Sequence, residues 1–170
     1  MYAVRFHGRG GQGAKTASRI LGTAAFLSGY QAQDSPIYGA ERRGAPVAAF
    51  TRFGREPIRE RGVIAHPDLV VVADASLLKD PAARVSDGIT DQTILFVNSP
   101  LHAEQIRTQS GLPGRITTLG VTEIALQHFG QREAISALLG AGAARLAGLQ
   151  QEPPRQASAR ELGDLGVAPS

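Results

Sequence analysis

Cysteine is absent from this chain of 170 residues. Without a thiol, the chain cannot hold an iron-sulfur cluster by thiolates, build a disulfide framework or use a catalytic cysteine. Aromatic residues make up only 5% of the chain, and tryptophan is absent. Because base stacking needs aromatic platforms, we expect no nucleic-acid binding, although the formal net charge is +3.

Long apolar runs are also missing, since no stretch approaches the roughly 20 residues of a membrane-spanning helix. Residues 1–7 open directly on an alternating strand pattern, without the basic head and apolar core of a signal peptide. We therefore expect a cytoplasmic protein with no membrane segment. Its length predicts one compact domain with a substantial core.

Short strand patterns alternate with helical patterns along the chain. Continuous apolar runs at 69–74 and 93–98 are typical of strands that are covered on both faces. The pattern predicts an α/β domain with three layers, α/β/α, and a largely parallel central sheet, which the segment 47–58 can make mixed. Further strands are expected at 1–7, 30–33, 47–53 and 116–119, and helices from 14 to Gly29, from Asp80-Pro81, and over 101–110, 121–129 and 132–149.

A glycine-rich loop, His7-Gly8-Arg9-Gly10-Gly11-Gln12-Gly13, joins the first strand to the first helix. Backbone N–H groups at a helix N-terminus favour an anion, most often a phosphate. Glycines also permit a tight turn and close helix packing, which is the structural alternative.

Two nucleotide-binding patterns partly fit the same loop. Gly8, Gly10 and Gly13 have the dinucleotide spacing, with Asp34 at the end of the second predicted strand as a ribose ligand. The run from Gly8 to Lys15 and Thr16 nearly matches a Walker A loop, with Asp74 as the candidate metal-binding residue. One additional residue, however, turns Lys15 about 100° around the helix. A free-standing NAD- or nucleotide-binding protein is thus the alternative reading.

The glycine loop together with a second motif, Tyr38-Gly39-Ala40-Glu41-Arg42-Arg43-Gly44-Ala45-Pro46, resembles the gamma subunit of 2-oxoacid:acceptor oxidoreductases, the pyruvate:ferredoxin oxidoreductase family. The resemblance covers roughly residues 1–149 as one gamma-type domain. Residues 150–170, which contain Pro153-Pro154, are expected to be a flexible or partner-bound tail.

The resemblance implies an enzyme that decarboxylates a 2-oxoacid on thiamine diphosphate and passes the acyl group to coenzyme A and the electrons to ferredoxin or another acceptor. Pyruvate is the first expectation for the 2-oxoacid. It also implies that thiamine diphosphate with Mg and the [4Fe-4S] clusters belong to partners: alpha and beta subunits and a ferredoxin-like subunit or domain. The lack of cysteine agrees with the placement of the [4Fe-4S] clusters on partner subunits.

Site residues follow from the same resemblance. It implies that Lys15 contacts a coenzyme A phosphate, with Arg9 and the loop residues Gly10, Gly11, Gln12 and Gly13 in support; a solvated helix lysine is the alternative. Tyr38, Glu41, Arg42 and Arg43 are expected in subunit contacts or gating, and the two arginines either form inter-subunit salt bridges or contact substrate.

No catalytic or metal-binding set is predicted in this chain. The four histidines, His7, His66, His102 and His128, are scattered without metal-ligand spacing. Nothing resembles a nucleophile elbow, a Ser-His-Asp set or a pair of acid-base carboxylates.

Overall fold

The computed structural model describes residues 1–36 and 43–129. Tyr38, Glu41 and Arg42, the predicted helix 132–149 and the predicted tail 150–170 lie outside the described residues. Within the described part, the elements are β1 Tyr2–Arg9, α1 Ala14–Leu27, β2 Gln31–Pro36, β3 Pro46–Gly54, β4 Leu69–Val72, the short 3-10 turns η1 Ala75–Lys79 and η2 Pro81–Ala83, β5 Ile94–Asn98, α2 Ala103–Ser110, β6 Arg115–Leu119 and α3 Val121–Phe129.

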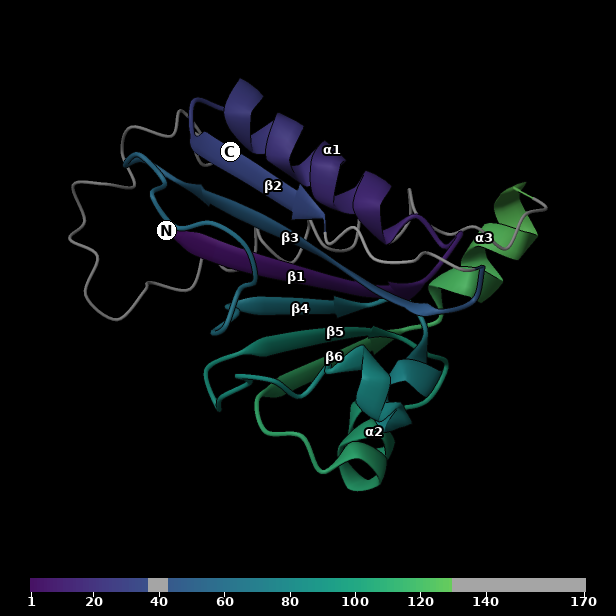
Figure 1. Cartoon of the computed structure of the whole chain (residues 1–170). Helices are drawn as coiled ribbons and strands as arrows, with labels where there is room; N and C mark the ends of the chain where they lie inside the picture. Colours follow the sequence, from purple (N-terminus) through teal and green to yellow (C-terminus); the bar gives the residue numbers. More distant parts are fainter. Residues whose placement is uncertain (37–42, 130–170) are drawn as a thin grey trace, which may run out of the picture.

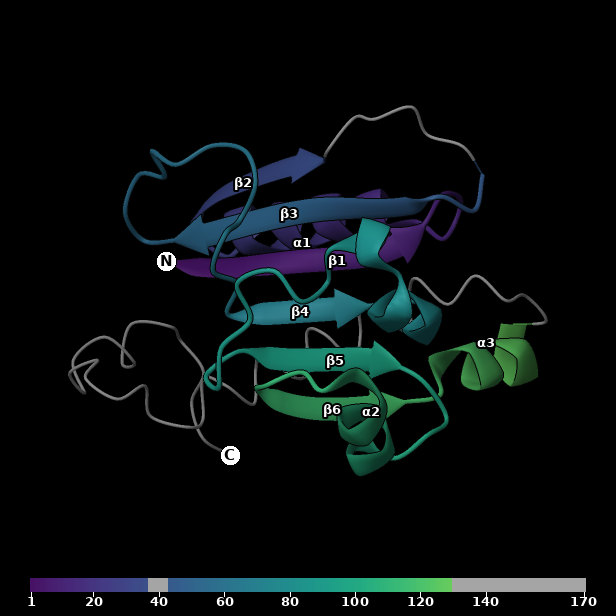
Figure 2. The ribbon, with the colours of Figure 1, turned by 60° about the horizontal axis from the view of Figure 1, so that its bottom comes forward.

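The six strands form one mixed sheet in the order β2-β3-β1-β4-β5-β6. β1, β4, β5 and β6 pair in parallel, whereas β3 lies antiparallel between β1 and β2. The α/β class and the largely parallel sheet are therefore confirmed, and the predicted mixed character comes from β3. Figures 1 and 2 show α1 over the β2-β3-β1 half of the sheet and α2 beside β5 and β6.

The strands of the sheet centre are buried on both faces, which explains their unbroken apolar runs. On one face, Val4 and Phe6 of β1 pack with Ala14 and Ala17 of α1. On the other face, apolar side chains of β4 and β5 pack beneath η1, η2 and α2. The core thus has a layer on each side of the sheet, as predicted.

The connection between β4 and β5 differs from a regular helical crossover. Asp80 accepts a hydrogen bond from the N–H of Ala82, and Pro81 occupies the first position, as the sequence predicts. The turn nevertheless ends after Ala83, because Arg84 adopts a left-handed backbone with φ 50°. The connection therefore contains two short 3-10 turns in place of a regular helix.

Candidate functional site

The glycine loop joins the carboxyl end of β1 to the N-terminus of α1. Gly13 is the N-cap of α1 with φ 77°, and Gly11 has φ 95°. Both values lie in the left-handed region that glycine adopts without steric cost. A Cβ on Gly8 would lie 3.3 Å from the Cβ of Ala14, so Gly8 allows the helix to approach the strand closely. The tight turn and the exposed helix end are therefore both products of the glycines.

The N–H groups of the loop do not all point outward. Gly10 donates to the carbonyl of Ala45 at 2.8 Å, and Gln12 donates to the carbonyl of Arg9 at 2.9 Å. Within residues 1–36 and 43–129, the N–H groups of Gly11 and Gly13 have no internal acceptor. The first turn of α1 also contains no acidic residue. The capacity for an anion is thus concentrated at Gly11, Gly13 and the start of α1.

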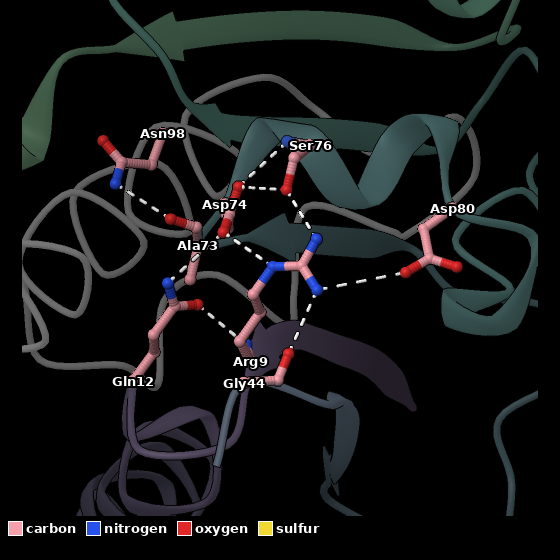
Figure 3. A network of polar contacts seen from close by, with 8 residues as sticks. All are labelled: Arg9, Gln12, Gly44, Ala73, Asp74, Ser76, Asp80 and Asn98. Atoms are coloured by element: carbon pink, nitrogen blue, oxygen red, sulfur yellow. Dashed lines mark hydrogen bonds and ion pairs between the residues drawn. The ribbon is translucent and has the colours of Figure 1, made fainter.

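Arg9 lies at the centre of a polar network that joins the glycine loop to η1 (Figure 3). Its Nε donates to Oδ2 of Asp74 at 3.0 Å, and one terminal nitrogen donates to the hydroxyl of Ser76 at 2.7 Å. The other terminal nitrogen donates to the carbonyl of Gly44 at 3.1 Å and lies 4.0 Å from a carboxylate oxygen of Asp80. The Arg9 guanidinium is therefore held by groups of its own chain.

Asp74 anchors this network at the carboxyl end of β4. It caps η1 by accepting from the N–H and the hydroxyl of Ser76, at 2.9 and 2.6 Å, and it also accepts from Arg9 and Gln12. Burial acts to raise the pKa of Asp74, but the hydrogen bonds from Ser76, Arg9 and Gln12 outweigh it, and the net effect lowers the pKa. Asp74 is thus a carboxylate at neutral pH. Its carboxylate is engaged by Arg9 and Gln12 of the glycine loop, and therefore does not face a site for a metal or a ribose.

The segment that follows residue 42 is fastened to the glycine loop. Gly44 donates to the carbonyl of Gly10 at 3.2 Å, while Gly10 donates to Ala45. Arg9 adds a further contact by donating to the carbonyl of Gly44 at 3.1 Å. Arg43 is exposed beside these contacts. The structure therefore brings the two sequence motifs together, although they are about 30 residues apart.

Lys15 lies in the first turn of α1, where it is half-buried. It is the second residue of the helix, two positions after the N-cap Gly13. Of the predicted site residues that the structure describes, Arg9, Gly10 and Gln12 serve the internal network, whereas Gly11, Gly13 and Lys15 lie at the helix end. Gly44 and Ser76 were not predicted, because their partners are distant in the sequence.

The carboxyl ends of β5 and β4 are tied together by Asn98. Its amide nitrogen donates to the carbonyl of Ala73 at 2.9 Å and to the hydroxyl of Thr122 at 2.8 Å. Its oxygen accepts from the N–H groups of Val121 and Thr122, which begin α3. Asn98 thus caps α3 from a neighbouring strand and fixes this helix at the same sheet edge as the Arg9 network (Figure 3).

The dinucleotide alternative is not favoured by the topology. In a dinucleotide fold, the strand that carries the ribose-binding acid lies in the parallel sheet beside the glycine-loop strand. Here β3 separates β2 from β1, and Asp34 lies near Gly22, in the middle of α1. About nine helical residues, or roughly 13 Å of helix, lie between Gly22 and the loop. Asp34 therefore cannot act at the glycine loop.

Two further properties were assessed on the described residues alone. In residues 1–36 and 43–129 there is no group of three His, Asp or Glu side chains arranged to hold a metal ion. No helix in the same ranges is long and apolar enough to cross a membrane.

A glycine loop between a central strand and the first helix, in a mixed six-stranded sheet, defines the chain as an α/β domain of the glycine-loop class. The chain belongs to the pyruvate ferredoxin/flavodoxin oxidoreductase family, whose model matches residues 3–168. The family resemblance inferred from the two motifs is thus confirmed.

Individual relatives agree with this assignment. The chain is 43% identical to the pyruvate/ketoisovalerate oxidoreductases common subunit gamma of Thermococcus kodakarensis, covering 98% of this chain and 90% of the relative. It is 46% identical to the protein of that name from Pyrococcus furiosus, covering 83% and 76% respectively. The crystal structure of pyruvate oxidoreductase subunit PORC from Thermotoga maritima aligns with a TM-score of 0.74 and 35% identity, over 96% of this chain and 89% of that one.

Proposed function

We propose that the chain is the gamma subunit of a 2-oxoacid:ferredoxin oxidoreductase that oxidatively decarboxylates a 2-oxoacid, with pyruvate as the first expectation, to acyl-coenzyme A and CO2. The names and coverage of its relatives support this role. Alpha and beta subunits and a ferredoxin-like subunit are the proposed partners. They would hold thiamine diphosphate, Mg and the [4Fe-4S] clusters, since this chain has no cysteine to supply thiolate ligands.

Within that enzyme, we propose that the glycine loop binds a phosphate group of coenzyme A. The observation that carries the proposal is that, within residues 1–36 and 43–129, the N–H groups of Gly11 and Gly13 at the N-terminus of α1 have no acceptor, and the first turn of α1 contains no acidic residue. Lys15, in the first turn of the same helix, supplies a positive charge next to them. When bound, coenzyme A supplies the thiol that accepts the acyl group.

Arg9, Gly10 and Gln12 take a supporting part in this proposal. Their polar groups bond to Asp74, Gly44 and Ala45 and hold the loop in the shape that exposes the other two N–H groups. Tyr38, Glu41, Arg42 and Arg43 are proposed to contact the other subunits or to gate access. Because Gly44 is hydrogen-bonded to Gly10 and Arg9, a movement of the segment around Gly44 would change the geometry of the glycine loop.

The experiment is steady-state kinetics of the complete enzyme complex with coenzyme A as the varied substrate. Lys15→Ala is compared with Lys79→Ala, which removes the only other lysine of the chain from an exposed position. We expect Lys15→Ala to raise the KM for coenzyme A about tenfold, the loss of one charge-assisted contact, with little change in the KM for the 2-oxoacid. Equal KM values in both variants would contradict the phosphate role.

Subunit co-purification provides the second readout. A complex that assembles with normal stoichiometry but unchanged coenzyme A kinetics would retain the gamma-subunit role and reject the loop as the binding site. A chain that purifies alone and never restores activity to the thiamine-binding subunits would reject the gamma-subunit role itself.

A further inference from the structure

A cavity of about 670 Å³ lies on the face of the sheet opposite α1. Its described walls come from β1, β3, the segment 63–66 and the turn around η2, and they include Pro46, Val47, Ala48, Phe50 and Ala83. The register pairs Arg5 with Phe50 and His7 with Ala48. Paired residues of antiparallel strands project to the same face, so these four side chains share the cavity floor. Small-molecule sites commonly have this size and largely apolar lining.

The floor of this cavity carries a buried cation. Arg5 is 2% exposed, and its terminal nitrogens donate to the carbonyls of Ile64 and Val85, at 3.4 and 2.6 Å. Among the described residues, its Nε has no hydrogen-bond partner. In the described part of the chain, no carboxylate oxygen forms an ion pair with Arg5; the nearby Asp87 is paired with Arg84 at 2.7 Å. A buried charge that is bonded only to neutral carbonyls is costly, and an incoming anion would offset that cost.

His7 lies beside Arg5 and is also 2% exposed. Its Nε2 has no hydrogen-bond partner in the part of the chain that the structure describes, while the imidazole is hydrogen-bonded to the backbone of Ala83. Burial and the charge of Arg5 lower the pKa of His7 to about 4, so the ring is neutral at pH 7. His7 therefore adds polarity to the floor and no second charge. Arg84 and Asp87, which also line the cavity, form an ion pair with each other, so the charge to be balanced in the described walls is the single positive charge of Arg5.

We propose that this cavity binds a small carboxylate with an apolar body, its carboxylate toward Arg5 and its body along Ala48, Phe50 and Ala83. A single negative charge matches the guanidinium of Arg5, which forms no ion pair within residues 1–36 and 43–129, and an apolar body matches the largely apolar walls. A phosphate dianion fits less well, because its two negative charges exceed the single positive charge of Arg5. The proposal stands independently of the coenzyme A role, since it uses other residues on another part of the chain.

The test uses 4-phenylbutyrate as the probe, with 4-phenylbutanol and 4-phenylbutylamine as neutral and cationic controls of the same shape. Calorimetric titration of the full chain should give an affinity for the acid at least about tenfold above that for the alcohol, and the amine should bind most weakly. Equal affinity for all three compounds, or binding of none, would overturn the proposal.

Two variants locate the binding. Ala48→Phe fills the cavity and should lower the affinity for the acid at least about tenfold, whereas Ala24→Phe makes the same change on the exposed surface of α1 and should not. Arg5→Met should remove the preference for the acid over the alcohol. Should Arg5→Met not fold, the comparison of the three probes on the unmodified chain still decides the role of charge. Loss of probe binding when the chain assembles with its partner subunits would assign the cavity to a partner segment and overturn the small-molecule proposal.

Discussion

Replacing Asp74 by Asn would separate the charge of this residue from its capping role. Asn is isosteric and caps helices about as well as Asp, so the bond from the N–H of Ser76 at 2.9 Å can persist. What disappears is the ionic part of the contact with Arg9, whose Nε lies 3.0 Å from the carboxylate. The substitution therefore measures how much the charge pair contributes to holding the glycine loop against η1.

The magnitude follows from the exposure of the pair. Hydrogen bonds to charged groups contribute about 1.5–3 kcal/mol, and exposed ion pairs at most about 1 kcal/mol. The side chains of Arg9 and Asp74 are 29% and 26% exposed, which places them between these limits. We expect Asp74→Asn to lower the free energy of unfolding by about 1–2 kcal/mol, and Tm by about 3–6 °C for a domain of this size.

The assay is urea unfolding of the chain at pH 7 and at a series of lower pH values, with Asp91→Asn as the exposed control. Because folding lowers the pKa of Asp74, its stabilisation is complete above the ordinary carboxylate pKa and is lost as the pH falls through the folded value. The difference between Asp74→Asn and the unmodified chain should therefore shrink toward acid. A loss below about 0.5 kcal/mol at pH 7, or one equal to that of Asp91→Asn, would refute the reasoning.

Two other perturbations test the core around the cavity. Folding lowers the pKa of His7 to about 4, so its stabilising contribution is present above the ordinary value of 6.5 and is lost as the pH falls toward 4. We therefore expect the free energy of unfolding of the unmodified chain, measured in urea, to fall by up to about 3 kcal/mol more than that of His7→Gln between pH 6.5 and pH 4. The same pH dependence in both chains would contradict a buried neutral imidazole. Gly88→Ala should destabilise the chain by more than about 2 kcal/mol in thermal unfolding, because its Cβ would overlap the carbonyl oxygen of Ala65. Gly62→Ala is the matched control, because Gly62 has a similar positive φ but open space around it, and it should lower the free energy of unfolding by only about 1 kcal/mol. Equal losses in the two variants would show that the cost comes from backbone strain and that the overlap at Gly88 does not contribute.

Much of the secondary structure was predictable because burial leaves a local pattern. The runs at 69–74 and 93–98 are β4 and β5, whose residues are buried on both faces. The predicted helix 121–129 matches α3, and Gly29 follows the end of α1 with a positive φ, as its position in the sequence suggests. These features depend on the periodicity of side chains or on the freedom of one glycine, both of which can be read from neighbouring residues.

The candidate site was only half predictable. The glycine pattern correctly indicated a turn at the N-terminus of α1, but it could not show that the N–H of Gly10 is taken by Ala45. The sequence also indicated Asp74, but as the candidate metal-binding residue of a Walker-type site. It did not reveal that the partner of Asp74 is Arg9, because that contact joins residues 65 positions apart.

By itself, the sequence determined the order of strands and helices, the glycine turn, the inability to ligate a cluster through cysteine, and membership of the family, since each depends on residue types and local spacing. Tertiary structure decided that β3 inserts between β1 and β2, which moves Asp34 away from the loop, and that Arg5 and His7 come to lie in one cavity. It also decided that Arg9 turns inward to Asp74. Strand order and side-chain partners depend on which distant segments pack together, and the free energy of that packing is a property of the whole sheet.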